Sequence, residues 1–230
     1  MVSRAIAYGF LFLAPCVYGQ DPLERPVSDF NSKGVGLTET LLNFSHQQHL
    51  RIALEYLDRA SMDQPIIVNL QNKTVREGLD IILSNGHGYS WRLRNGIVEV
   101  TNSRGSKRAD KQLNMVIPVF KIADGETAKM ASVALWWNLQ LTLDPKLKGY
   151  GGDIMEGVEV STVKPAVLHN RTVREILAYI VLNSRADGWI VAGPPQCLGF
   201  TPYCGLWFLI ESVPSTPSYE LLLRDVRKNL

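Results

Sequence analysis

The sequence predicts an α+β protein built from two related modules, each with two helices packed on a small sheet of short strands that ends in a β-hairpin. Three observations predict this class. The motif Asn72-Lys73-Thr74-Val75-Arg76-Glu77 returns as Asn170-Arg171-Thr172-Val173-Arg174-Glu175, 98 positions later. The same spacing pairs Trp91 with Trp189. Stretches with apolar residues at helical spacing alternate with short β-rich runs in both halves. A match held at one fixed spacing indicates one supersecondary unit used twice.

Residues 1–19 have the features of a signal peptide. Arg4 supplies a positive charge, and Ala5 to Ala14 is an apolar run, shorter than the roughly 20 residues that span a bilayer. Small residues at Val17 and Gly19 predict cleavage before Gln20. Lipoprotein processing at Cys16 and a retained or buried N-terminal helix are the alternatives. We therefore expect an exported protein, either periplasmic or secreted.

Composition limits the classes of partner. The chain has 24 Lys and Arg against 22 Asp and Glu, so it lacks the strong basic footprint of a nucleic-acid binder. We expect no transmembrane segment in the mature chain. Beyond the signal segment only Cys197 and Cys204 remain, and an even pair in an oxidising compartment predicts a disulfide. The small loop that it closes is worth about 2–3 kcal/mol in the chain-entropy account.

The first module is expected at residues 37–101, after a loose lead-in at 20–36. Ser45 to Gln48 is interpreted as a capping box that opens a helix running to Leu57. A leading strand is possible near Leu41 to Phe44. The remaining elements are expected in this order: a buried strand at Ile66–Leu70, a helix opened by Thr74, and a hairpin whose strands flank the Asn95-Gly96 turn.

The second module is expected at residues 113–212, after a basic linker at 102–112. Its predicted elements are a strand from Met115 to Phe120, a helix from about Glu126 to Leu139, an edge strand from Val163 to Leu168, a helix from Thr172 to Leu182, and hairpin strands at Trp189–Ala192 and Leu206–Ile210. Residues 213–230 are expected to form a linker and a short amphipathic helix. That helix packs on the body of the protein or on a partner.

The two modules differ most in the hairpin turn. Residues Gly193 to Gly205 replace the tight Asn95-Gly96 turn with a long loop that contains both cysteines of the expected disulfide. Its apolar residues, Leu198, Phe200 and Tyr203, make it a candidate contact surface for a partner. The alternative is an ordinary insertion whose aromatic side chains fold back on the core.

The repeated Thr and Glu have a structural explanation. Thr74 with Glu77, and Thr172 with Glu175, fit the capping box, in which threonine caps the helix and glutamate bonds back to the cap amide. We therefore do not assign catalysis to these glutamates. The arginines between them are interpreted as solvated, with exposed contacts to anions as the alternative.

Two weaker patterns are compatible with an enzyme. His46 and His49 have a spacing compatible with a shared metal, but no carboxylate completes the pattern. Ser161 and Lys164 match the Ser-x-x-Lys acylating motif, which needs a helix, whereas β-branched neighbours and Pro165 favour a strand. We expect no cofactor and no metal.

The first module resembles the secretin and TonB N-terminal short domain. The resemblance rests on an expected helix with Leu50, Ala53 and Leu54, on the strand Ile66 to Leu70, and on the helix start Thr74-Val75-Arg76-Glu77. It rests also on Gly88-Tyr89-Ser90-Trp91 leading into Gly96-Ile97-Val98-Glu99-Val100. It covers about Leu41 to Thr101 and, more weakly, Val116 to Glu211. It implies a small two-helix module of the bacterial envelope that is used for protein contacts.

The function expected from the sequence is therefore non-enzymatic. We expect an envelope adaptor that binds another envelope protein, for which exposed sheet edges are natural acceptors of a partner strand. An envelope hydrolase, working through Ser161 and Lys164 or through a metal at His46 and His49, is the first alternative. A small-molecule or glycan binder that uses Trp136, Trp137 or Trp207 is the second.

Overall fold

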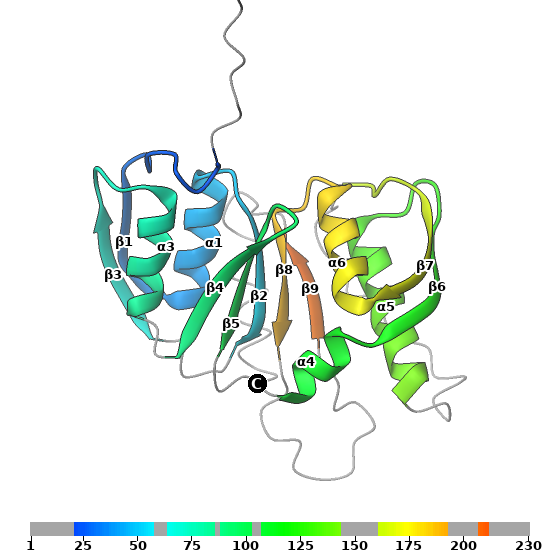
Figure 1. Cartoon of the computed structure of the whole chain (residues 1–230). Helices are drawn as coiled ribbons and strands as arrows, with labels where there is room; N and C mark the ends of the chain where they lie inside the picture. Colours follow the sequence, from blue (N-terminus) through cyan, green and yellow to red (C-terminus); the bar gives the residue numbers. More distant parts are fainter. Residues whose placement is uncertain are drawn as a thin grey trace, which may run out of the picture.

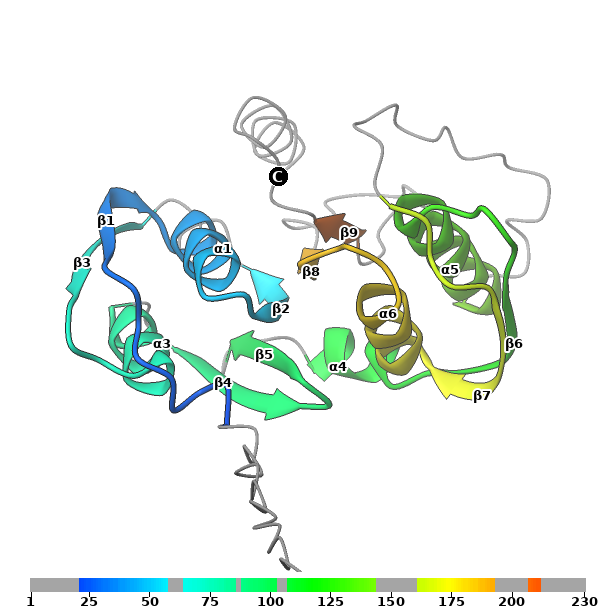
Figure 2. The same cartoon turned by 90° about the horizontal axis from the view of Figure 1, so that it is seen from above.

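The chain forms a central sheet with a pair of helices on each face and a two-stranded sheet outside each helix pair (Figures 1 and 2). The α+β class predicted from the sequence is therefore confirmed. This computed structural model describes residues 21–57, 64–85, 88–102, 107–143, 161–192 and 207–211. None of the helices in these ranges has the length and apolar character that a bilayer-spanning helix needs.

The N-terminal half supplies one outer sheet, two helices and three strands of the central sheet. Strands β1 and β3 form the outer sheet and pair antiparallel. Helices α1 and α3 lie between this sheet and the central one (Figure 2). The elements are β1 (Phe30–Gly36), α1 (Leu37–Gln47), β2 (Arg51–Leu57), β3 (Pro65–Leu70), α3 (Val75–Ser84), β4 (Tyr89–Arg94) and β5 (Ile97–Asn102).

The C-terminal half has a similar order of elements. Strands β6 and β7 form the second outer sheet and also pair antiparallel. Helices α5 and α6 lie between that sheet and the central one, and α4 packs beside α6. The elements are α4 (Lys107–Leu113), β6 (Val116–Ile122), α5 (Ala128–Leu143), β7 (Ala166–Thr172), α6 (Val173–Leu182), β8 (Gly188–Ala192) and β9 (Trp207–Glu211).

Strand β2 joins the two halves. The order of the central sheet is β4-β5-β2-β8-β9, with one antiparallel hairpin at each end. Strand β2 lies between the hairpins and pairs in parallel with both β5 and β8. Each half therefore contributes its own hairpin, and β2 is the strand that bridges them among the described residues.

The two faces of the central sheet contribute to two different hydrophobic cores. Ile52 and Leu54 of β2 belong to the core beneath α1 and α3, whereas Ala53 between them belongs to the core beneath α5 and α6. Strand β2 is thus buried on both faces. A strand in this position loses the polar–apolar alternation by which half-buried strands are recognised in sequences.

Both repeated motifs form the capping box predicted from the sequence. In α3 the amide of Glu77 donates to the Thr74 hydroxyl at 3.2 Å, and the amide of Thr74 donates to the Glu77 carboxylate at 2.8 Å. Thr172 and Glu175 repeat both bonds at the start of α6. The predicted Asn95-Gly96 turn is also formed, with φ of 51° and 77° at its two central residues.

Four predictions for the N-terminal half are wrong. Ser45 does not open a helix, because it lies inside α1 and its hydroxyl donates to the carbonyl of Leu42. Residues 41–44 belong to α1 rather than to a leading strand, and the helix expected up to Leu57 is replaced by β2. The expected loose lead-in contains β1, and its Leu23 is 2% exposed.

The linker and the later strands need smaller corrections. The basic linker predicted at residues 102–112 contains most of α4, and Gln112 is buried. Strand β7 begins after Pro165, about three residues later than predicted. The signal segment, the Cys197–Cys204 pair, the loop residues Leu198, Phe200 and Tyr203, and the C-terminal helix all lie outside the described residues.

Candidate functional site

The repeated motif places one arginine at the second residue of each capped helix. Arg76 lies at this position in α3, and Arg174 lies there in α6. The two side chains share a local sequence and a local backbone, but their surroundings differ. Arg174 is buried, whereas the side chain of Arg76 is 43% exposed.

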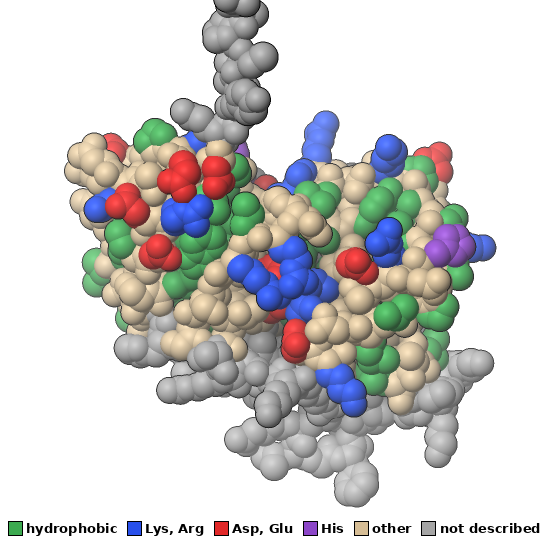
Figure 3. Space-filling model, viewed as in Figure 1, with side chains coloured by type: hydrophobic (Ala, Val, Ile, Leu, Met, Phe, Trp, Pro, Cys, Tyr) green, Lys and Arg blue, Asp and Glu red, His purple; other side chains and the backbone are tan. Residues whose placement is uncertain are grey.

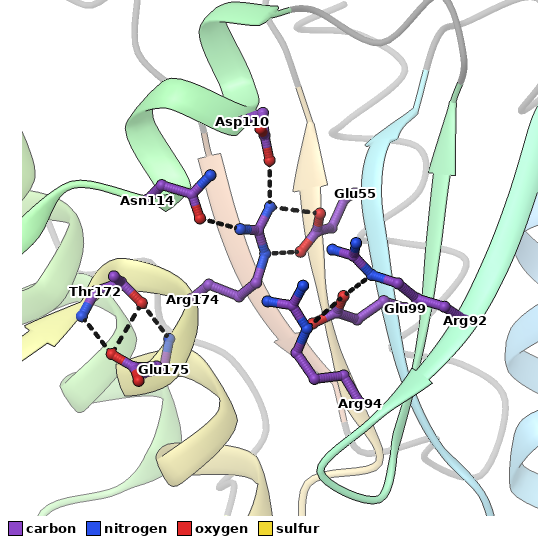
Figure 4. A network of polar contacts seen from close by, with 9 residues as sticks. All are labelled: Glu55, Arg92, Arg94, Glu99, Asp110, Asn114, Thr172, Arg174 and Glu175. Carbon is purple, nitrogen blue, oxygen red and sulfur yellow. Dashed lines mark hydrogen bonds and ion pairs between the residues drawn. The ribbon is translucent and has the colours of Figure 1, made fainter.

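Arg174 binds carboxylates and an amide from two other segments (Figure 4). Its Nε and Nη2 donate to the two carboxylate oxygens of Glu55 at 2.8 and 2.9 Å. Nη2 also donates to Asp110 at 2.8 Å, and Nη1 donates to the side-chain carbonyl of Asn114. One guanidinium thus connects α6 with the bridging strand β2 and with α4 or the turn that follows it.

The carboxylates keep Arg174 charged despite its burial. Burial alone lowers the pKa of this guanidinium, but the hydrogen bonds and the charge of Glu55, with further contributions from Asp110 and Glu99, raise the pKa above its ordinary value. The Arg174 and Glu55 side chains are each 5% exposed. A buried pair in this bidentate geometry compensates much of the cost of removing both charges from water.

A second buried carboxylate lies next to this pair. Glu99 of β5 is 2% exposed and binds two arginines of β4, with its Oε2 at 2.6 Å from Nε of Arg92 and 3.5 Å from Nε of Arg94 (Figure 4). Both arginines are about half exposed. Figure 3, which has the same view as Figure 1, shows cationic side chains gathered at the centre of the molecule, between the two halves.

An open groove of about 410 Å³ lies beside Arg76, on the N-terminal half. Its lining consists of Asp21, Leu23, Arg76, Asp80, Trp91, Arg92 and Leu93. Arg76 lies over the Trp91 ring, 5.7 Å from its centroid, and Asp80 accepts a hydrogen bond from the Trp91 indole at 2.7 Å. The groove is therefore partly apolar, with a cation and a carboxylate fixed on its wall.

Arg76 is held by carboxylates from the segment before β1. Its Nε donates to Glu24 at 2.7 Å, and its Nη2 donates to Asp21 at 3.3 Å. All three side chains are between 43% and 52% exposed, so water screens these ion pairs. The contact to Glu24 is the largest contribution to the raised pKa of Arg76.

The two segments that approach the arginines also accept the same backbone hydrogen bond, from the first residue of α3 or of α6. The amide of Val75 donates to the carbonyl of Arg25 at 3.0 Å, and the amide of Val173 donates to the carbonyl of Met115 at 3.0 Å. Counting back from these carbonyls, Glu24 and Asn114 are each one residue earlier, and each binds the arginine of its own half. Leu23 and Leu113, two residues earlier, are both buried.

The two sites differ in the strand next to the hairpin. In the C-terminal half, β2 pairs with β8 and brings Glu55 to Arg174. In the N-terminal half, β4 corresponds in sequence to β8 and is the end strand of the described sheet. Its outer edge faces no other described strand, and the groove beside Arg76 is lined by three of its residues.

The histidines and the Ser-x-x-Lys pair are not brought together into a site. Nδ1 of His46 lies 3.3 Å from the carboxylate of Asp187, and His49 follows the end of α1 with a φ of 52°. The hydroxyl of Ser161 accepts from the amide of Arg185 at 2.6 Å, and Lys164 lies in an irregular segment rather than a helix. In the described ranges no three His, Cys, Asp or Glu residues are grouped as a metal site requires.

The sequence interpretation missed Glu55, and its prediction that both arginines are solvated is wrong for Arg174, which is buried against Glu55. Glu55 was hidden because the spacing of Leu50, Ala53, Leu54 and Leu57 suits a helix as well as a buried strand. The arginines themselves lay inside the repeated motif, and that repetition was the only local signal. Comparison with protein-family models, with curated proteins and with solved structures yields no match.

Proposed function

We propose that this chain is an exported, non-enzymatic adaptor that binds an extended segment of another envelope protein. The segment adds as a strand to the outer edge of β4 and places alternate side chains in the groove beside Arg76. The groove that is lined by three residues of this end strand carries the proposal. Such strand addition uses backbone hydrogen bonds for affinity and side-chain pockets for selectivity.

The lining of the groove suits a peptide. Leu93 is 39% exposed and supplies apolar surface at the strand edge, while Arg76 and Asp80 supply fixed charges nearby. The indole N–H and one face of Trp91 are already engaged by Asp80 and Arg76. Arg76 leaves a sugar less ring surface of Trp91 on which to stack, so this groove suits a peptide better than a glycan.

The same lining gives less support to the hydrolase alternative. It contains no serine, cysteine or histidine that could act as a nucleophile or base. Ser161 and Lys164, the pair named for that chemistry, do not line the groove. Their separate contacts give the pair no shared geometry.

The relatedness of the two halves is part of this proposal. It is supported by the repeated motif, by the two capping boxes, and by asparagines in the left-handed region two residues before each cap, at φ of 55° and 51°. The likeness of the first module to the secretin and TonB N-terminal short domain, and export to the envelope, are proposed with it. The stapled loop at Cys197–Cys204 and the C-terminal helix remain further candidate surfaces.

Site-specific photo-crosslinking tests this function. A photoreactive amino acid at Leu93 should capture one envelope protein in living cells, whereas the same amino acid at Met130 of α5, which is 46% exposed, should not. A synthetic segment of the captured protein should then shift the amide resonances of Tyr89 to Arg94 in the purified protein. Equal capture at both positions, or a segment that leaves the β4 amides unchanged, would exclude strand addition at this edge.

A further inference from the structure

We infer that the partner segment runs parallel to β4, with a small residue opposite Trp91 and a carboxylate opposite Leu93 that binds Arg76. This inference rests on the proposed function and specifies its ligand. The observation behind it is that the corresponding place in the C-terminal half, the edge of β8, is already filled by a strand. That strand is β2, which the N-terminal half contributes.

Strand β2 gives the orientation and the register. It runs parallel to β8, with Ala53 opposite Trp189 and Glu55 opposite Val191. Ala53 is fully buried beside Trp189, which is 1% exposed. Glu55 lies two residues further along the same face and reaches Arg174.

Each of these positions of β8 and α6 has a counterpart in the N-terminal half. The spacing of 98 residues matches Trp189 with Trp91 and Arg174 with Arg76. It also matches Val191 with Leu93. Like Arg174, Arg76 is the second residue of a capped helix, so its guanidinium starts from an equivalent backbone position.

The groove corresponds to the space that β2 fills in the other half. Beside Arg174 that space is occupied by Glu55, which is 4% exposed. Beside Arg76 it is an open groove whose lining includes Trp91 and Leu93. Leu23 also lines the groove. Its segment corresponds to the segment with Leu113, because both accept the same backbone hydrogen bond from the start of a capped helix.

Trp91 limits the size of the ligand side chain that can lie opposite it. Opposite Trp189, β2 carries Ala53, whose single methyl group fits beside the ring. Because Trp91 is held by Asp80 at 2.7 Å and covered by Arg76, a large side chain opposite it would have to displace both. The ligand is therefore an extended peptide with alanine, serine or glycine two residues before glutamate or aspartate.

The two halves differ in the competitor for the arginine. Arg174 meets neutral Asn114 where Arg76 meets Glu24. The Glu24 side chain is 52% exposed, and an exposed pair of this kind is readily exchanged for a better-placed carboxylate. Glu24 therefore acts as a competitor of the ligand carboxylate, and Glu24→Asn gives the N-terminal half the residue found in the other half.

The probe is a peptide of residues 50–57, which include the whole of β2, to which a solubilising lysine tail and a fluorophore are added. We expect saturable binding to the full protein, and about tenfold weaker binding when the peptide carries Glu55→Gln or the protein carries Arg76→Gln. Glu24→Asn should strengthen binding several-fold. Arg171→Gln, an exposed change on the other half, should leave it unchanged.

Amide spectra separate this inference from the proposed function. Binding should shift β4 but not β8, whose edge β2 already fills, and a spin label on the peptide N-terminus should broaden Tyr89 more than Arg94. An envelope segment that shifts β4 in the antiparallel orientation, or regardless of its carboxylate, would overturn this inference and leave strand addition intact. If no envelope segment shifts β4, the proposed function is wrong as well. Concentration-dependent protection of β4 without peptide would point to a second copy and overturn the assignment to a partner protein.

Discussion

Arg174 of α6 donates two parallel hydrogen bonds to Glu55 of β2, a residue 119 positions earlier in the chain. The pair lies where the hairpin of the C-terminal half meets the strand contributed by the N-terminal half. Both side chains are 5% exposed. A charge pair at this junction stabilises the fold only while both partners are present.

Replacing Arg174 by methionine should lower the free energy of unfolding by about 3–5 kcal/mol, because Glu55 then remains buried without a compensating charge. Urea denaturation followed by circular dichroism measures the change. Arg171→Met is the matched control, since the Arg171 side chain, near the end of β7, is 57% exposed and pairs with Glu175 of α6 at the surface. This control should change stability by less than about 0.5 kcal/mol. Equal losses in the two variants would show that the buried pair contributes no more to stability than the exposed pair does.

The double variant Arg174→Met with Glu55→Met should recover much of the stability lost in the single variant. Removing both charges leaves two apolar side chains of similar length in a buried site. The coupling between the two changes, measured by a double-mutant cycle, should be at least about 1 kcal/mol. Strict additivity would mean that the two side chains do not act as a pair. Replacing Asp110, the exposed partner of Arg174, should change stability little, because its side chain is 68% exposed and water screens its charge.

Replacing Glu175 by glutamine should flatten the acid side of the stability profile. The backbone amide of Thr172 is the main cause that lowers the pKa of Glu175 below its ordinary value of 4.5. A lowered carboxylate pKa gives stability that is fully present above the unfolded value and is lost as the pH falls through the folded value. Chemical denaturation between neutral pH and pH of about 3 should show a smaller loss in the variant than in the parent. Identical pH profiles would show that this cap does not titrate with folding.

Replacing Gly78 by alanine should destabilise the protein although alanine is the better helix former. A Cβ at this position would lie 2.7 Å from Cζ of Phe44 and 3.2 Å from Cδ1 of Leu70. The clash should cost about 1–3 kcal/mol, which exceeds the gain of about 1 kcal/mol in helix propensity. Thermal unfolding of Gly78→Ala, alone and with Phe44→Leu, measures this balance. If the single change stabilises the protein, the contact between α1 and α3 is looser than the structure shows.

Replacing Gly188 by alanine should disturb the pairing of β2 with β8. A Cβ at Gly188 would lie 1.9 Å from the carbonyl oxygen of Ile52, so one of the two strands must move. Glycine within a strand often marks this kind of close backbone approach. We expect faster hydrogen exchange at the β8 amides, with the β4–β5 hairpin changed much less. A uniform change across the whole central sheet would contradict this local effect.

Local signals in the sequence were sufficient for several elements. The Thr74 and Thr172 caps fixed the starts of α3 and α6, because a threonine followed by a glutamate three residues later satisfies the first amides of a helix. Asn95 and Gly96 fixed the β4–β5 hairpin, because the turn requires positive φ at two successive residues. These interactions span only a few residues and need no tertiary partner.

The interpretation failed where burial decided the structure. Residues 51–57 have apolar positions that suit a helix, but β2 is buried between two hairpins and needs apolar side chains on both faces. The segment before β1 appeared loose because it is rich in polar residues and proline. Its Leu23, Val27 and Phe30 are nevertheless buried, in one hydrophobic core with the side chains of α1 and α3.

The sequence by itself determined the α+β class, both helix caps, the hairpin turn and the position of an arginine two residues after each cap. Only the tertiary structure decided that Arg174 is buried beside Glu55 while Arg76 lines an open groove. The two motifs are almost identical, so nothing local distinguishes the two arginines. The difference arises because the single bridging strand β2 pairs with β8 and leaves β4 at the end of the sheet.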